Sequence, residues 1–333
     1  LPHIGNAYEF AEMLSEMLGE LNISHSGARY SSSDPADDAT ASLGIFYDQA
    51  YDGPGIKVVE VIRNGPLDRA GMDVKPGMII EAIDGETVAA DADPAVYLNR
   101  KAGKRTLLVV TEGSRKRELV VTPVTTSQEG TLLYDRWVRR NREEVERVSG
   151  GTLGYIHIPG MSDGAFRTAF EEALGRFPDR KGLVVDTRFN GGGDLVADLD
   201  MFLTGERFFT YTTDTRATGY EPNFRWTKPS VSLAGEANYS DGHCYAYVYK
   251  ELKIGTLIGM PTPGTCTFAG WETLPDGTRW GVPGMGVKNN AGQYLENRQT
   301  EPDIQVFNEQ NVVSRGRDQQ LEAAVAELQK RVK

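Results

Sequence analysis

The hydrophobic pattern of the amino-terminal segment predicts one amphipathic helix. Apolar side chains recur at spacings of three and four residues between positions 7 and 21, which places them on one face of a helix. They are Phe10, Met13, Leu14, Met17, Leu18 and Leu21. The helix leads to Ser24-His25-Ser26, and residues 31–38 are rich in serine and aspartate. We interpret residues 31–38 as a linker.

From residue 41 to residue 123 the pattern changes to short strands separated by turn residues. Apolar runs of strand length occupy residues 43–46, 56–62, 78–80, 107–111 and 118–122. Asp84-Gly85 is a hairpin-turn signal. Residues 65–71 predict a single helical turn that ends at Gly71, and Pro94 can open a second helical stretch. This segment is therefore predicted to be rich in β-strands.

Beyond residue 126 helical and strand patterns alternate. Two apolar runs of strand length, at 153–158 and 182–186, are separated by a helical pattern at 166–177. This order predicts two parallel strands joined by a right-handed crossover. Helical spacings recur in Leu133, Trp137, Val138 and Val145, in Tyr245, Tyr249 and Leu252, and in Leu321, Val325 and Leu328. The predicted fold class is α/β, or α+β, with more than one domain.

Composition narrows the possible partners. The chain has 333 residues, 39% of them hydrophobic, enough for two or three cores. Its formal net charge of -11 argues against nucleic-acid binding, which needs a clustered basic surface. No run approaches the roughly 20 apolar residues of a membrane span, and no signal-peptide pattern precedes the first helix. Because the sequence begins with Leu1, we expect it to be part of a longer protein. The compartment is left open.

The two cysteines, Cys244 and Cys266, are too few for a metal cluster or a disulfide framework. One bridge between them is possible, but their spacing does not require it. We expect both to be small buried side chains.

Ser240 lies where a helix is predicted to begin, after a loosely strand-like run at 231–237. The free N–H groups and the positive dipole end of a helix favour a developing oxyanion, so Ser240 is a candidate nucleophile. The alternative is that Ser240 is only an N-cap and Asp241 only a first-turn acid, since both residue types are preferred there.

Residues 191–193 are three consecutive glycines that follow a predicted buried strand. Glycines let backbone N–H groups approach a ligand closely, as in a phosphate site or an oxyanion hole. The segment lacks the Lys-Ser/Thr pair of a phosphate-binding loop and the spacing of a dinucleotide fingerprint. An oxyanion hole and a tight turn without a ligand are the interpretations that stay open.

His25 is a candidate general base because its neighbouring serine hydroxyls can orient it. The alternative is a polar helix end with an exposed histidine. His243 is a rival, three residues after Ser240, but i and i+3 side chains on one turn do not readily give in-line geometry, so we favour His25. We expect His157, on an apolar strand, to be a hydrogen-bonded core histidine.

The β-rich segment resembles a PDZ domain. The resemblance rests on Ser42-Leu43-Gly44-Ile45, Gly65-Pro66-Leu67-Asp68-Arg69-Ala70-Gly71-Met72, Lys75-Pro76-Gly77-Met78-Ile79-Ile80 and Ile83-Asp84-Gly85. PDZ domains bind an extended peptide by strand addition, with loop N–H groups on its terminal carboxylate. This implies substrate binding at Leu43, Gly44 and Ile45. The alternative is a β-rich spacer whose groove is covered by neighbouring parts of the chain.

As a whole, the chain resembles the tail-specific serine proteases, and more narrowly the carboxy-terminal half of tricorn-type proteases. The shared motifs, in order, are Ser24-His25, the PDZ-like segment, Asp186-Thr187-Arg188-Phe189-Asn190-Gly191-Gly192-Gly193, Tyr239-Ser240-Asp241-Gly242 and the run from Leu295-Glu296-Asn297 to Pro302-Asp303-Ile304. The resemblance implies a helical segment at 1–40 that carries the catalytic histidine. It also implies a PDZ-like domain at 41–125 and an α/β sandwich catalytic core of the tail-specific protease (crotonase-like) type at 126–333.

The resemblance also implies roles for single residues. Ser240 matches the nucleophile of a serine peptidase and His25 its general base. Ser24 matches the residue that holds the histidine, and Glu296 matches the acid that orients it. Glu301 is a rival acid, ranked lower because a proline follows it.

The backbone N–H groups of Gly193 and Asp241 match an oxyanion hole. Asp214 is the nearest match to an aspartate that favours basic residues beside the scissile bond. The implied substrates are peptides or unfolded polypeptides, without a metal or nucleotide cofactor, and the implied assembly is a homo-oligomer.

Two other functions are compatible with this sequence. One is a non-catalytic peptide- or lipid-binding protein on the same fold, which retention of the serine, histidine, glutamate and glycines disfavours. The other is a PDZ scaffold with a degenerate partner domain, which would bind peptides without turning them over.

Overall fold

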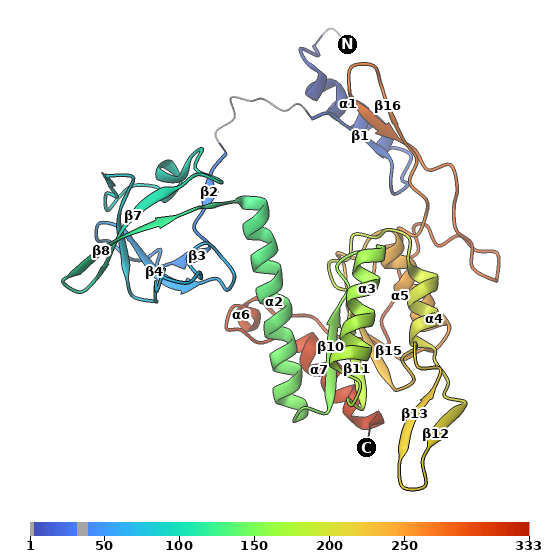
Figure 1. Cartoon of the computed structure of the whole chain (residues 1–333). Coiled ribbons are helices and arrows are strands. Elements are labelled where there is room, and N and C mark those ends of the chain that lie inside the picture. Colours follow the sequence, from blue (N-terminus) through green and yellow to red (C-terminus); the bar gives the residue numbers. More distant parts are fainter. Residues whose placement is uncertain (1–2, 32–38, 333) are drawn as a thin grey trace. The chain divides into compact units, whose positions relative to one another are not determined.

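The computed structural model describes residues 3–31 and 39–332. The chain divides into two compact units, Leu1–Ser32 with Asn141–Lys333, and Ser33–Arg140. Figure 1 shows the elements of both. Most of the predicted linker, residues 32–38, lies outside the described residues. The division into 1–40, 41–125 and 126–333 stays a prediction.

The unit Ser33–Arg140 is built on an antiparallel sheet with the strand order β3-β4-β5-β7-β8. These strands are β3 (Ile45–Tyr47), β4 (Ile56–Val61), β5 (Ile79–Ile83), β7 (Thr106–Glu112) and β8 (Arg115–Val121). β6 (Glu86–Thr87) returns onto β5 through the predicted Asp84-Gly85 turn. Residues 65–71 form two separate turns and not the predicted helical turn, because their hydrogen bonds, Asp68 to Gly65 and Met72 to Arg69, are not continuous.

Four more elements contribute to this unit, the last of them with its residues up to Arg140. The 3-10 helix η1 (Pro94–Leu98) begins at the proline, as predicted. β2 (Ala41–Ser42) pairs with β9 (Val124–Thr125), and α2 (Thr126–Ser149) follows β9 directly. This pairing fixes the start of α2 beside the strand that leads into the Ser42–Ile45 loop.

The larger unit is organised around a five-stranded sheet in the order β10-β11-β14-β15-β18. The strands are β10 (Leu153–His157), β11 (Gly182–Asp186), β14 (Ser230–Ala234), β15 (Thr256–Gly259) and β18 (Ile304–Gln305). All neighbours are parallel, which confirms the predicted parallel pair. Every residue of the first four strands is buried, as expected of a parallel sheet covered on both faces. The α/β prediction is confirmed.

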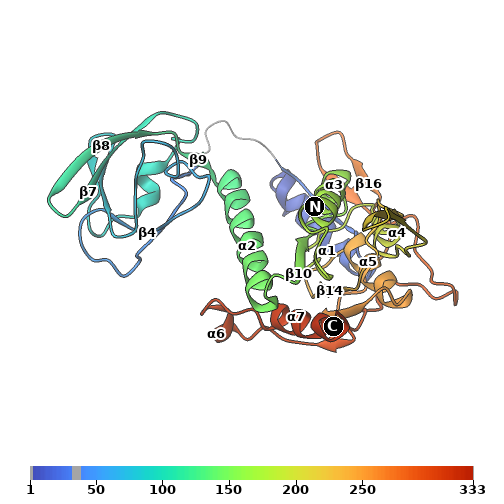
Figure 2. The ribbon, with the colours of Figure 1, turned by 60° about the horizontal axis from the view of Figure 1, so that its bottom comes forward.

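Helices cover this sheet on both faces. One face carries α3 (Asp163–Glu171) with its π-helical extension η2 (Glu172–Arg176), α4 (Val196–Leu203) and α5 (Asp241–Glu251). The other carries α7 (Gln319–Arg331), which follows the short α6 (Gln310–Val313). Figure 2 shows α7 on the side of the sheet away from α3, α4 and α5.

The amino-terminal segment packs and pairs with residues from the carboxy-terminal part of the chain. α1 (Ala7–Gly19) is the predicted amphipathic helix, capped by Asn6. β1 (Gly27–Arg29) joins β17 (Arg279–Gly281) and β16 (Trp271–Thr273) in a small antiparallel sheet. β12 (Phe209–Thr212) and β13 (Ala217–Glu221) form a separate hairpin. Among the described residues, no helix combines the length and apolar character that crossing a membrane requires.

Candidate active site

Ser240 occupies a tight turn between β14 and α5. Its backbone has φ 55° and ψ -125°, a strained conformation for a residue other than glycine. Such strain is typical of a strand-to-helix turn that exposes a nucleophile. Ser240 is the N-cap residue of α5, but its side chain makes no capping hydrogen bond. Capping therefore does not explain a serine at this position.

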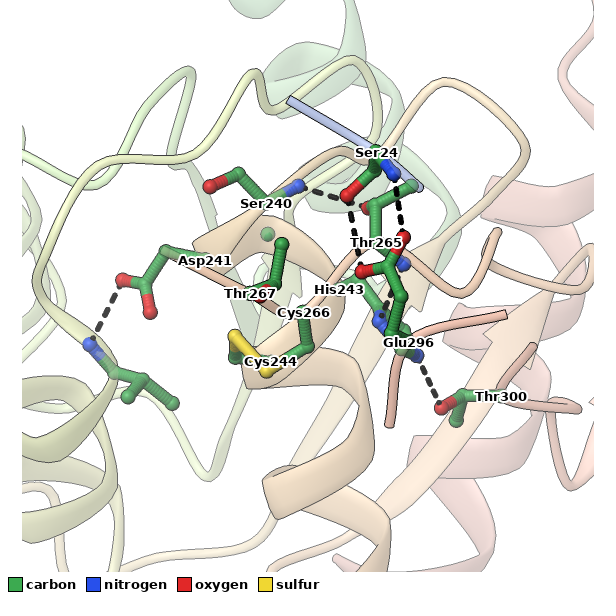
Figure 3. The surroundings of a disulfide bond; sticks show 12 residues. Ser24, Ser240, Asp241, His243, Cys244, Thr265, Cys266, Thr267, Glu296 and Thr300 are labelled. Carbon is green, nitrogen blue, oxygen red and sulfur yellow. Dashed lines mark hydrogen bonds between the residues drawn. A yellow bond between two sulfur atoms is a disulfide. The ribbon is translucent and has the colours of Figure 1, made fainter. Parts of the chain in front are cut away.

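Two hydrogen bonds in series connect this turn to Thr265 and His243 (Figure 3). The Ser240 N–H donates to Thr265 Oγ1 at 2.9 Å, and the Thr265 N–H donates to Nδ1 of His243 at 3.1 Å. Because Nδ1 of His243 accepts, the ring proton is on Nε2, which lies 3.0 Å from Thr300 Oγ1. Burial lowers the pKa of His243 to about 4. His243 is thus a buried, neutral support for Thr265.

The hydrogen bonds around His25 determine which of its nitrogens carries the proton. The Ser24 hydroxyl donates to Glu296 Oε2 at 3.0 Å, and the Ser24 N–H donates to Glu296 Oε1 at 2.6 Å. Ser24 Oγ also lies 2.8 Å from His25 Nδ1. Because the hydroxyl hydrogen is directed to Glu296, the oxygen accepts from His25 Nδ1–H. This tautomer leaves the lone pair of His25 on Nε2.

Tyr239 also holds His25 in place. The His25 N–H donates to the Tyr239 hydroxyl at 2.7 Å, and the two ring centroids are 4.7 Å apart. His25 itself has a φ of 59°, so both it and Ser240 have left-handed backbones. Burial lowers the pKa of His25, and the charge of Glu296 opposes this shift.

His25 and Ser240 line the same cavity, which has a volume of about 660 Å³. Within the described part of the chain, no hydrogen bond joins the two side chains. Catalytic hydrogen bonds are often long in unliganded sites and tighten when substrate binds. The cavity that both residues line has a volume typical of a ligand-binding pocket.

The glycine loop that follows β11 lies directly against Ser240. Asn190 fixes the loop, since its Oδ1 accepts from the Gly192 N–H at 2.8 Å and its Nδ2 donates to Ile158 O at 2.8 Å. Gly192 has a φ of +95°, and a Cβ there would lie 2.5 Å from Ser240 Cβ. Only glycine allows this close approach.

Gly193 and Asp241 line the same cavity as Ser240. Among the described residues, neither backbone N–H group makes a hydrogen bond. The Asp241 carboxylate accepts from the N–H groups of Leu195 and Val196 at 2.7 and 3.1 Å, which joins the start of α4 to the start of α5. Burial raises the pKa of Asp241, and these two hydrogen bonds oppose the shift.

The cysteines are not the separate buried side chains that we expected, because Cys244 and Cys266 form a disulfide with 5.1 Å between their Cα atoms. Cys244 lies one turn into α5, and Cys266 follows Thr265 in sequence. The hydrogen bond from Ser240 to Thr265 brings these two segments together. Sequence spacing does not reveal such a contact.

The wall of the cavity is mainly apolar. It includes Val196, Val248, Leu252, Phe268, Val287 and Leu295 together with the disulfide. Charged residues at the lining are Asp194, Asp241, Glu251 and Lys288. α5 contributes a continuous stripe of this wall, from Ser240 to Leu252.

Three predicted residues lie elsewhere. Asp214 is exposed in the turn between β12 and β13, which a hydrogen bond from Thr213 N to Arg216 O closes, so the structure does not bring it to the cavity. The Glu301 carboxylate accepts from Gln299 and not from His25. His157 is buried, and its Nε2 lies 2.9 Å from Arg188 O, as expected of a core histidine.

The predicted substrate-binding residues Leu43, Gly44 and Ile45 belong to the unit Ser33–Arg140. Three residues that were not predicted as site residues position Ser240, His25 and the glycine loop: Thr265, Tyr239 and Asn190. Tyr239 directly precedes Ser240, and Asn190 directly precedes the three glycines. These neighbouring positions were the feature of the sequence that could have identified both residues.

The fold and this site together define an α/β domain in which a serine and a histidine line one cavity. A glutamate is joined to the histidine through Ser24, and a PDZ-like unit lies in the same chain. Residues 152–306 match the model of peptidase family S41, and residues 55–126 match the tricorn protease PDZ domain. These regions therefore belong to peptidase family S41 and to the tricorn type of PDZ domain. The recognition made from the sequence motifs is confirmed.

Individual relatives agree. The chain is 30% identical to a tricorn protease homolog of Saccharolobus solfataricus, over 98% of this chain and 31% of the relative. It is 29% identical to the tricorn protease of Thermoplasma acidophilum, over 98% of this chain and 31% of that protein. A crystal structure of the tricorn protease superposes with a TM-score of 0.85 at 27% identity, over 98% of this chain and 33% of that one. The chain thus spans about a third of the length of these relatives.

Proposed function

We propose that the chain is a serine peptidase in which Ser240 attacks a peptide carbonyl and His25 is the general base. The observation that carries this proposal is the hydrogen-bond series from Glu296 through Ser24 to His25 Nδ1, which leaves a lone pair on Nε2 in the cavity of Ser240. A serine hydroxyl is a weak nucleophile, so it needs such a base.

The proposed chemistry balances over two steps. Ser240 Oγ bonds to the carbonyl carbon while its proton moves to His25 Nε2, and the oxyanion lies against the N–H groups of Gly193 and Asp241. His25 then gives the proton to the leaving amine as the C–N bond breaks, which leaves an acyl-enzyme. A water molecule that loses its proton to His25 hydrolyses the ester and restores Ser240.

The cavity supports a substrate class as well. Its mainly apolar wall, to which Val248 contributes from α5, and the position of Asp214 in an exposed turn favour an apolar side chain beside the scissile bond over the basic one implied by the resemblance. The proposed substrates are peptides or unfolded polypeptides, because folded proteins rarely offer an extended segment to such a cavity. Assembly into a homo-oligomer stays a prediction, which light scattering on the purified chain would test.

Labelling with a fluorophosphonate probe tests the proposed nucleophile. We expect the intact chain to be labelled at Ser240, Ser240→Ala to be unlabelled, and His25→Ala to be labelled at least about 10²-fold more slowly, the usual contribution of a general base. His243→Ala is a poor control because it removes a support of Thr265. The control is His157→Gln, which changes a core histidine outside the cavity and should keep normal labelling. Absence of labelling in the folded wild-type chain would favour the non-catalytic binding protein.

A further inference from the structure

The unit Ser33–Arg140 contains a groove between β3 and η1. A cavity of about 190 Å³ lies there, with an apolar wall that includes Leu43, Ile45, Ile56 and Leu98. β3 is an edge strand of its sheet, so its outer edge is unpaired within the described residues. An unpaired edge beside an apolar groove is the arrangement to which an extended peptide adds as a further strand.

One end of this groove differs from what a carboxylate-binding loop requires. The Ser42 hydroxyl donates to the carboxylate of Glu129 and accepts from the Gly44 N–H at 2.9 Å. One loop amide that would bind a ligand carboxylate is therefore already engaged within the chain. Glu129, which also lines the cavity, places a negative charge beside the same loop.

The position of Glu129 is set by the backbone and not only by a side-chain rotamer. β9 pairs with β2 in the register Ala41 with Thr125 and Ser42 with Val124, and α2 begins at the next residue. Glu129 is in the first turn of α2. The pairing of the two strands thus carries this acid to the loop.

The charge of the lining agrees with this assignment. The acidic residues that line the groove are Asp93 and Glu129, and the described residues place no lysine or arginine in its wall. A peptide that ends at this loop in a free carboxylate would face the negative charge of Glu129, whereas a peptide bond or an amide at that point is neutral and can donate a hydrogen bond.

We propose that this groove binds an internal, extended apolar segment of a polypeptide, and that Glu129 excludes free carboxy-termini from it. The proposal concerns binding alone and does not depend on the proposed peptidase activity. It differs from the terminal-carboxylate binding that resemblance to PDZ domains implies.

A pair of peptides tests the proposal. The probes are two fluorescein-labelled hexapeptides of identical apolar sequence, one with a free carboxy-terminus and one with a terminal amide. Binding to the full chain carrying Ser240→Ala, which prevents turnover, is measured by fluorescence anisotropy. We expect the amide to bind about tenfold more tightly than the acid, since juxtaposed like charges weaken binding. Glu129→Gln should raise the affinity for the acid and bring the two dissociation constants close together.

Two further variants make the result specific. Glu118→Gln removes the same charge from β8, away from the groove, and should leave the ratio of the two affinities unchanged. Ala95→Trp fills the groove from η1 and should abolish binding of both peptides. Thermal unfolding of each variant shows whether it is folded. The proposal is overturned if the wild-type chain prefers the acid, if Glu129→Gln leaves the ratio unchanged, if neither peptide binds, or if binding survives Ala95→Trp.

Discussion

The hydroxyl of Ser24 lies 3.0 Å from Oε2 of Glu296, although 272 residues separate them in the sequence. This contact joins the amino-terminal segment to the carboxy-terminal part of the same unit. It also explains how Glu296 can act on His25 without touching it, because the Ser24 hydroxyl lies between the carboxylate and Nδ1. We infer that Ser24 and Glu296 are positioning residues.

Loss of the hydrogen bond between Ser24 and Glu296 should affect the rate of the reaction more than the stability of the fold. We expect Ser24→Ala to lower kcat/KM for a fluorogenic peptide by about 10²-fold, because the imidazole loses the acceptor that fixes its tautomer. Glu296→Gln keeps an oxygen acceptor for the Ser24 hydroxyl, so its loss should be smaller, about tenfold.

Glu301→Gln is the matched control, because it changes the rival acid, which pairs with Gln299. It should keep the wild-type kcat/KM. Equal losses in the Glu296 and Glu301 variants, or full activity of Ser24→Ala, would contradict the assignment.

The pH dependence should report the environment of His25. In the proposed mechanism the neutral imidazole is the active form, so kcat/KM should rise with pH through the pKa of His25. Burial lowers this pKa, and we therefore expect the acidic limb of the profile below the usual histidine value of 6.5. Glu296→Gln removes the charge that opposes the shift, so the limb should move to still lower pH. A limb that moves upward in this variant would exclude His25 as the titrating base.

Local patterns in the sequence predict the elements of this fold well. The helix at 7–21 is α1, the apolar runs at 153–158 and 182–186 are β10 and β11, and Asp84-Gly85 forms the hairpin turn. Each of these elements depends on residues that are close in the sequence, so the spacing of apolar and turn residues is enough to predict it. The two turns at 65–71 were not predicted, because a short segment rich in turn residues has no hydrophobic periodicity from which its structure can be inferred.

The site depends on contacts that no local pattern encodes. Thr265 supports Ser240 across 25 residues, and the glycine loop reaches Ser240 from another strand. Such contacts follow from the parallel order of β11, β14 and β15, which brings the ends of these strands together. A serine neighbour that orients His25 was predicted from the residues themselves, whereas the role proposed for Glu296 was accessible only through resemblance. The disulfide and the exposed position of Asp214 required the structure.

The Cys244–Cys266 disulfide should stabilise the larger unit and fix Thr265. The bond closes a loop across a sequence separation of 22, for which chain entropy gives about 3 kcal/mol. We expect Cys244→Ala/Cys266→Ala to lower the free energy of unfolding by about this amount in a urea titration. Labelling of Ser240 should also slow, because the Thr265 segment loses its covalent tie to α5.

Reduction of the wild-type chain provides the control for this prediction. Dithiothreitol should lower the free energy of unfolding of the wild-type chain and leave that of the double variant unchanged. A wild-type chain whose urea midpoint and labelling rate do not respond to the reductant would show that the bond does not support the site.

Specificity should depend on the apolar side chains that α5 contributes to the cavity wall. Val248 is half-buried, lies two turns beyond Ser240 and lines the cavity. We expect the wild-type chain to prefer peptides with leucine over arginine before the scissile bond. Val248→Asp should lower kcat/KM for the leucine peptide by about tenfold and raise it for the arginine peptide, because a buried charge disfavours an apolar group and favours a cation. Val313→Asp, in α6 and outside the cavity lining, should change neither value. If the wild-type chain already prefers arginine, or if Val248→Asp changes both peptides equally, α5 does not select the side chain.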